Sequence, residues 1–202
     1  MNEIYLASKS PRRLELLQQI GVACKMILLR EDGGRMRDID EEPLASENPF
    51  VYVERMAKMK ADIGVLRAKQ RALPPMPLIG ADTTVVFNGQ ILGKPKNAED
   101  AARMLKMLSG STHEVLTAVA VTNGNRMLHD TSITRVRFRD LTDAEIKNYI
   151  ASGEPMGKAG SYAVQGVGGV FVERIEGSYS GVMGLPLYET SILLSRFGIQ
   201  VI

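Results

Sequence analysis

The chain has 202 residues, of which 45% are hydrophobic and 24% are charged, and its formal net charge is +2. This length can bury a sizeable core, so we expect a single domain over residues 1–202 with two lobes. The nearly balanced charge, without a basic tail or a basic surface interleaved with aromatic residues, argues against nucleic-acid binding.

The single cysteine, Cys24, fits a reducing compartment and is interpreted as a buried strand residue. Without a signal-peptide pattern or a membrane-length apolar run, we expect a soluble cytoplasmic protein that does not contact membranes.

The N-terminal stretch predicts a strand that enters a helix through a tight turn. The apolar run at residues 4–7 is typical of a short buried strand. Pro11 suits the first helical position, because proline lacks the N–H that this position leaves unbonded, and Ser10 precedes it as the natural N-cap.

This helix begins with two arginines, where acidic residues are usually preferred. Arg12 and Arg13 lie over the free backbone N–H groups of the first turn, and no acidic residue occurs in this helix before Glu15. Guanidinium groups bind phosphate oxygens in pairs, and the hydroxyls of Ser8 and Ser10 can add donors. The pattern favours a phosphate site, although solvated or ion-paired arginines are the alternative.

The following elements alternate between strands and helices. The pattern predicts a strand at 24–29, a polar loop at 30–48 and a helix from Pro49 capped by Asn48. A strand at 77–87, a hairpin turn at Asn88-Gly89, a helix from Asn97 to Leu108 and a second hairpin at 114–122 and 127–139 follow. The last predicted elements are a helix after the capping box Thr142–Glu145, a glycine-rich region at 158–184 and a final helix at 186–196. We therefore expect an α/β fold with a curved mixed β-sheet flanked by helices.

Asp82 lies inside an otherwise apolar predicted strand. Buried aspartates are rare without a partner or a metal, so from the strand alone a catalytic or metal role is about as plausible as a structural one. The neighbouring arginine-rich site favours catalysis. The acidic run Asp40-Glu41-Glu42 offers oxygen ligands of the kind that magnesium prefers, although such runs are most often simply solvated.

Several other motifs fail to indicate a known chemistry. His113 and His129 are too few and too differently placed for a zinc site or a catalytic triad, and His113 is interpreted as structural. The segment 166–169 lacks the third spaced glycine of a dinucleotide loop. Ser178 and its neighbours do not match a nucleophile elbow, so covalent catalysis is disfavoured.

An ordered set of short motifs covers nearly the whole chain. These motifs are LAS-x-SPRR at 6–13, GADT at 80–83, GKP at 93–95, SG-x-x-H at 109–113, GEP at 153–155, KAG-x-Y-x-x-QG at 158–166, GSY at 177–179 and GLPL at 184–187. Together they resemble the Maf family, which was first named for septum formation and whose members are nucleoside triphosphate pyrophosphatases.

The resemblance implies a fold similar to that of inosine triphosphate pyrophosphatase, with two lobes around a cleft, and a homodimer. It implies hydrolysis of a nucleoside triphosphate with a divalent metal, magnesium or manganese, with cobalt as the alternative. By the match, Asp82 is the proton acceptor and holds the metal with Glu41. The residues matched to substrate binding are Ser8, Arg12, Arg13, Lys60, Thr83, Lys94, Lys158 and Gln165.

Three positions bear on the substrate. Arg12, Thr83 and Gln165 fit the branch linked to dTTP and UTP, whereas the branch linked to 7-methyl-GTP carries an aromatic residue, glutamine and glutamate there. The alternatives are a pyrophosphatase for 7-methyl-GTP or other modified nucleotides, and a nucleotide-binding regulator of cell division.

Two segments depart from the family pattern. Residues 30–47 are longer and more basic than the family loop, which leaves Asp40 as an alternative to Glu41 as the acidic metal ligand. Residues 67–77 are also longer than expected.

Overall fold

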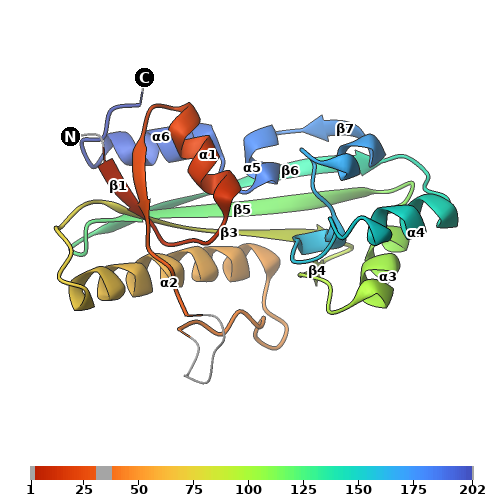
Figure 1. Ribbon diagram of the computed structural model, residues 1–202, viewed down its shortest axis with the longest axis horizontal. Coiled ribbons are helices and arrows are strands. Elements are labelled where there is room, and N and C mark those ends of the chain that lie inside the picture. The colour runs from red at the N-terminus through yellow and green to blue at the C-terminus, as the bar shows by residue number, and fades with distance from the viewer. Residues whose placement is uncertain (1–2, 31–37, 202) are drawn as a thin grey trace. The chain divides into compact units, whose positions relative to one another are not determined.

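The computed structural model describes residues 3–30 and 38–201 (Figure 1). Contacts divide the chain into two compact units, each assembled from separate segments. The first unit comprises Met1–Asp82, Thr117–Ser132 and Gly184–Ile202, and the second comprises Thr83–Leu116 and Ile133–Met183. The chain therefore passes repeatedly between the units, and Asp82 is the last residue of the first segment.

Seven strands form one sheet within the described residues. They are β1 (Glu3–Leu6), β2 (Ala23–Met26), β3 (Leu78–Phe87), β4 (Gln90–Leu92), β5 (Thr112–Thr122), β6 (Met127–Phe138) and β7 (Val172–Glu176). Their order is β2-β1-β3-β5-β6-β7, and β4 pairs with β3. β1 is parallel to β2 and β3, whereas the β3–β4 and β6–β7 pairs are antiparallel. The predicted mixed sheet is confirmed.

The helices follow the predicted order closely. They are α1 (Pro11–Gln19), α2 (Pro49–Gln70), α3 (Ala98–Leu108), α4 (Asp143–Ala151), α5 (Tyr179–Met183) and α6 (Leu187–Ser195), with short 3-10 helices η1 (Ala159–Ser161) and η2 (Val167–Phe171). The sequence pattern did not predict β7 or α5, because both lie in the region interpreted as glycine-rich. Across the described residues, no helix combines the length and hydropathy needed to cross a membrane.

The predicted caps are largely present. The side chain of Asn48 accepts a hydrogen bond from the Phe50 N–H, and Thr142 and Glu145 form a complete capping box. Asn88 and Gly89 both have positive φ, at 49° and 77°, as a two-residue hairpin of this kind requires.

Two sequence predictions need correction. Ser10 occupies the N-cap position of α1, but within the described residues its side chain makes no capping hydrogen bond. Its N–H instead donates to the hydroxyl of Ser8, 3.0 Å away. Cys24 is half-buried and not fully buried, because it lies on β2, the strand at the edge of the sheet.

The polar loop predicted at 30–48 can be compared only in part, since residues 31–37 lie outside the described residues.

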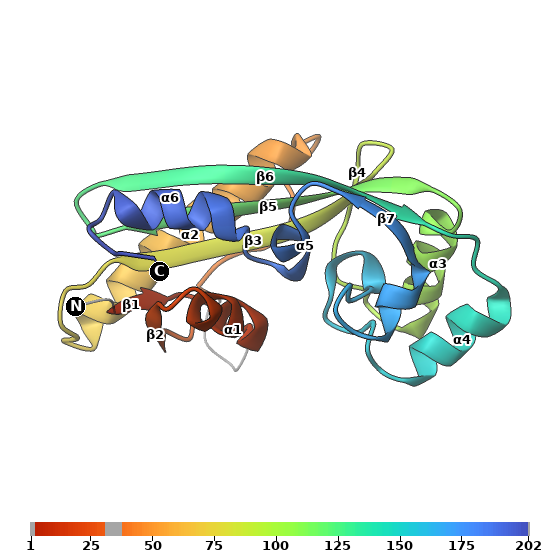
Figure 2. The same cartoon turned by 90° about the horizontal axis from the view of Figure 1, so that it is seen from above.

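In the first unit, α2 lies along one face of the sheet, and α1 and α6 lie along the other (Figures 1 and 2). The contact between α2 and β3 is unusually close at Gly80. A Cβ atom on this glycine would stand 2.5 Å from the backbone nitrogen of Ala61 and closer still to the carbonyl oxygen of Ala57. Only glycine allows the helix backbone to approach the strand in this way.

The second unit has its own core, which surrounds a buried histidine. The buried side chains come from β3–β6, α3, α4 and the 159–172 region, and they include Leu105, Phe138 and Phe171. His113 is 2% exposed; its Nε2 lies 2.9 Å from the Tyr162 hydroxyl, and its ring packs edge-on against Phe138 at 4.9 Å. This environment is consistent with the structural role predicted for His113.

Gly80→Ala tests the close approach of α2 to β3. We expect the variant to lose about 3 kcal/mol of unfolding free energy, because the new methyl group meets helix backbone that cannot turn aside. Urea denaturation would measure this loss. Gly93→Ala is the matched control, since a Cβ there meets nothing within 4 Å and should change stability by less than about 0.5 kcal/mol. Equal effects of the two substitutions would contradict the packing argument.

His113 predicts a pH dependence of stability. Burial lowers the pKa of His113 to about 4, from an ordinary value of 6.5. Because the unfolded chain then binds the proton more readily, stability should fall as the pH drops below about 6.5. We expect a loss of about 2 kcal/mol between pH 7 and pH 5, measured by urea denaturation. His113→Gln should flatten this slope, and an unaltered slope in that variant would assign the pH dependence to other groups.

Candidate active site

The side chain of Asp82 meets a lysine from the neighbouring helix. Asp82 lies on β3 and is 9% exposed, and the Nζ atom of Lys60, on α2, stands 2.6 Å from its Oδ1. The same ammonium lies 2.8 Å from Oε1 of Glu41. The contact of Gly80 with Ala61 explains this meeting, since it brings the helix turn that carries Lys60 against the strand that carries Asp82. Two carboxylates therefore converge on one cation.

The charge of Lys60 is stabilised by its two partners. Desolvation is the largest single effect and lowers the pKa of Lys60, but the attraction of Asp82 and Glu41 outweighs it. The resulting pKa lies above its ordinary value, so the lysine stays protonated at neutral pH.

Arg13 lies in the same electrostatic environment. Its Nε atom donates to the carbonyl oxygen of Gly184 at 2.7 Å, and its Nη1 atom donates to the Ser8 hydroxyl at 3.4 Å. Desolvation lowers the pKa of Arg13, whereas the negative charges of Asp82 and Glu41 raise it, and the net direction is downward. The first turn of α1 carries no acidic residue, as the sequence indicated. Arg13 is thus a partly desolvated cation close to the two carboxylates.

Glu41 is held in place through its backbone by α2. The hydroxyl of Tyr52 donates to the Glu41 carbonyl oxygen at 2.9 Å. Arg55 lies one turn further along and donates to Glu47 through Nε and Nη2, at 2.7 and 2.6 Å. Arg67, further along the helix, pairs with Asp38. Sequence reasoning missed these anchors, because tyrosine and arginine within a long helix suggest no particular partner.

The structure separates the two acidic residues that the sequence left as alternatives. Glu41 contacts the Lys60 ammonium, whereas Asp40 is exposed and its Oδ1 accepts the backbone N–H of Glu42 at 3.0 Å. Asp40 therefore shapes the turn, and Glu41 contributes its carboxylate to the cluster.

The remaining sequence-predicted residues divide between the units. Arg12 is half-buried on α1, in the first unit. Thr83, Lys94, Lys158 and Gln165 belong to the second unit. There, the N–H of Gly160 donates to the carbonyl oxygen of Gly93 at 3.2 Å, which joins the segments that carry the two lysines. The first unit thus contains Ser8, Arg12, Arg13, Glu41, Lys60 and Asp82, and the second contains Thr83, Lys94, Lys158 and Gln165.

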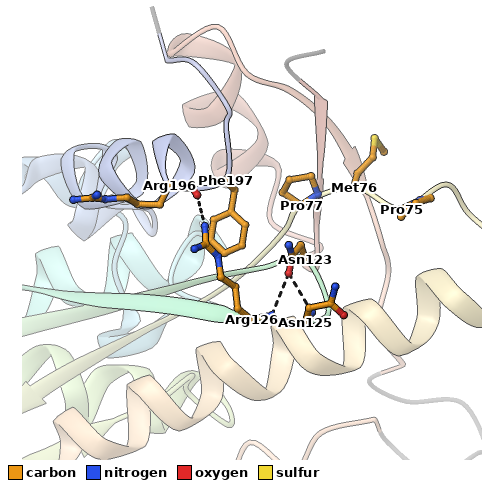
Figure 3. A pocket seen from close by; sticks show the side chains of 8 residues that line it. All are labelled: Pro75, Met76, Pro77, Asn123, Asn125, Arg126, Arg196 and Phe197. Carbon is orange, nitrogen blue, oxygen red and sulfur yellow. Dashed lines mark hydrogen bonds between the residues drawn. The ribbon is translucent and has the colours of Figure 1, made fainter.

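A pocket of about 480 Å³ lies elsewhere in the first unit (Figure 3). Its lining residues are Pro75, Met76, Pro77, Asn123, Asn125, Arg126, Arg196 and Phe197, and none was predicted as a site residue. The Arg126 guanidinium lies 4.6 Å from the centre of the Phe197 ring and donates to the Arg196 carbonyl oxygen. This arginine therefore holds the C-terminal segment, and the pocket offers no reactive group.

Comparison with known proteins agrees with the motifs. The family model described as Maf-like protein matches residues 3–197. The dTTP/UTP pyrophosphatase of Aromatoleum aromaticum is 54% identical over 96% of this chain and 95% of its own length. The protein of the same name from Nitrosomonas europaea is 52% identical over 99% and 97%, respectively. Among solved structures, the Staphylococcus aureus Ham1 protein is 13% identical, with a TM-score of 0.39 over 68% of this chain and 72% of that chain. Because the family model spans nearly the whole sequence and these two curated relatives share more than half of the aligned residues, the chain belongs to the Maf family.

Proposed function

We propose that this protein is an enzyme that hydrolyses nucleoside triphosphates, with dTTP and UTP preferred, to the monophosphate and pyrophosphate. The observation that carries this proposal is the convergence of Asp82 and Glu41 on the ammonium of Lys60, with Arg13 beside them. Relatives that are 54% and 52% identical and carry the name dTTP/UTP pyrophosphatase support the same activity.

The triphosphate is bound by the positive groups. Arg12 and Arg13 lie at the N-terminus of α1, where the helix dipole favours an anion. The hydroxyl of Ser8 lies within reach of Arg13 and orients the guanidinium. Lys94 and Lys158 supply further positive charge for the phosphate chain.

Asp82 is the base in the proposed reaction. It accepts a proton from a water molecule while the water oxygen bonds to the α-phosphorus. The bond from the α-phosphorus to the bridging oxygen breaks, and pyrophosphate leaves with that electron pair. Lys60 retains its proton and stabilises the charge of the leaving group.

The carboxylate pair fits a divalent cation. Glu41 and Asp82 already direct oxygens at one positive charge, and two carboxylates completed by substrate phosphates are the donor set that magnesium prefers. Within the described ranges, no group of three or more His, Cys, Asp or Glu residues could hold a metal by itself. Glu41 and Asp82 would therefore hold Mg²⁺ or Mn²⁺ together with the substrate. The ion would supply charge neutralisation on the phosphate oxygens.

The base of the nucleotide is selected by Thr83 and Gln165, with Arg12 as the third position typical of the dTTP and UTP branch. A hydroxyl and an amide can both donate and accept hydrogen bonds, as a uracil or thymine edge requires. Thr83 is half-buried at the start of the second unit, and Gln165 is half-buried in a tight loop of that unit.

Pyrophosphate release tests this function directly. The substrates are dTTP, UTP, CTP, GTP, ITP and 7-methyl-GTP, each with Mg²⁺ or Mn²⁺ and with an EDTA control. We expect metal-dependent release that is fastest with dTTP and UTP. Faster release from 7-methyl-GTP would refute the assignment of the base. Nucleotide binding without release from any substrate would favour the regulator of cell division.

Asp82→Asn tests the base. Asparagine keeps the size of the side chain and can still accept a hydrogen bond from Lys60, but it cannot take a proton from water. We expect kcat for dTTP to fall at least about 100-fold, while KM changes by less than about threefold. Asp62→Asn, at an exposed position on the same helix as Lys60, is the control and should leave both constants unchanged. A near-normal kcat in Asp82→Asn would remove Asp82 from this role.

A further inference from the structure

Gln165 lies in a short loop that is tethered on both sides by side chains of one segment. The loop connects η1 to η2 in the second unit. On one side of Gln165, the N–H of Ala163 donates to the Tyr149 hydroxyl at 3.2 Å. On the other side, the N–H groups of Val167 and Gly168 donate to Glu154, each at 3.0 Å. These two side chains therefore hold the backbone on both sides of Gln165.

Glu154 connects the two tethers. Its Oε1 accepts hydrogen bonds from the Tyr149 hydroxyl at 2.7 Å and from the Gly168 N–H, and its Oε2 accepts from the Val167 N–H. Both carboxylate oxygens are thus occupied by donors. Partial burial raises the pKa of Glu154. The hydrogen bonds from the Gly168 N–H, the Tyr149 hydroxyl and the Val167 N–H together lower it by more, so the pKa lies below its ordinary value. The group is an anion at neutral pH, which is the form that accepts all three bonds.

The loop is built to admit these two side chains. A Cβ on Gly166 would stand 2.5 Å from Oε1 of Glu154, and a Cβ on Gly168 would stand 2.5 Å from the Tyr149 hydroxyl. Any side chain at either glycine would push the loop away from its tethers. The two glycines that follow Gln165 are consequently matched to the carboxylate and the phenol that hold the loop.

The backbone of Glu154 also holds a predicted substrate ligand. The Nζ atom of Lys158 donates to the Glu154 carbonyl oxygen. One residue therefore supports Gln165 with its carboxylate and Lys158 with its main chain. A change confined to the side chain should disturb the first function and spare the second.

We propose that Glu154 is a positioning residue for substrate selection, which fixes the loop that presents Gln165 to the base of the nucleotide. This inference rests on the proposed function. Glu154 does not contact the reacting phosphate in this proposal; it acts through the Ala163–Gly168 backbone. Its loss should weaken discrimination among bases and leave the chemical step unchanged.

Glu154→Gln tests this role. The amide keeps one acceptor oxygen but places an NH2 group against an N–H of the loop, so at least one tether is lost and replaced by repulsion. We expect KM for dTTP and UTP to rise on the order of tenfold, and the preference for dTTP over CTP in kcat/KM to fall by a similar factor. The kcat at saturating dTTP and the inhibition constant of inorganic tripolyphosphate, which has no base, should both stay within about twofold.

Two further variants complete the test. Tyr149→Phe removes one of the three donors to Glu154 and the acceptor of the Ala163 N–H, but it leaves the bonds from the Val167 and Gly168 N–H groups in place. It should shift KM and base preference in the same direction. It also decides the question if Glu154→Gln does not fold. Glu99→Gln, at an exposed position on α3, is the control for loss of a carboxylate and should behave like the unmodified protein.

The outcomes are distinguishable. Unchanged KM and base preference in Glu154→Gln and Tyr149→Phe would overturn the inference while leaving the pyrophosphatase activity intact. Equal weakening of every nucleotide and of tripolyphosphate would also overturn it, because Glu154 would then be only structural. An unmodified protein that releases no pyrophosphate from dTTP or UTP would overturn the proposed function on which the inference rests.

Discussion

The ammonium group of Lys60, shared by Asp82 and Glu41, is the interaction on which the candidate site depends. Moving charged groups out of water is costly, and the attraction between them compensates only where the geometry is tight. Here both N–O distances are below 3 Å, at 2.6 and 2.8 Å. Such a cluster requires its backbones to be held rigidly. The contact of Gly80 with the backbone of α2 provides that rigidity on one side, because it brings helix and strand together without side chains between them.

The other carboxylate comes from a loop and therefore needs separate support. Tyr52 and Arg55 project from α2 to the segment that carries Glu41 and bind it through a carbonyl oxygen and through Glu47. The helix thus supplies both the lysine of the cluster and the anchors of the loop. This arrangement explains why one long helix, with few reactive residues of its own, determines the position of the acidic groups.

The sequence predicted those features that depend on neighbouring residues. The caps of α2 and α4 and the hairpin at Asn88-Gly89 follow from local rules, and the structure bears them out, whereas the side chain of Ser10 forms no cap in the part of the chain that the structure describes. The sequence also indicated that Asp82 needs a partner. It could not identify Lys60 from the residues alone, because the pair is 22 residues apart and meets only through packing of α2 on β3. Resemblance to a family supplied that residue, but not Tyr52 or Glu154, whose roles are visible only as contacts.

The two kinds of site residue are supported in different ways. In the first unit, charged groups on a strand, two helices and a loop neutralise one another, so a change at any one alters the charge of the whole cluster. In the second unit, the backbone on both sides of Gln165 is held by hydrogen bonds to Tyr149 and Glu154. Loops that are held by a few hydrogen bonds can change sequence without disturbing a rigid catalytic scaffold. Under the proposed roles, a change in this loop or its tethers would alter the preferred base, while the Asp82–Lys60–Glu41 cluster keeps the reaction.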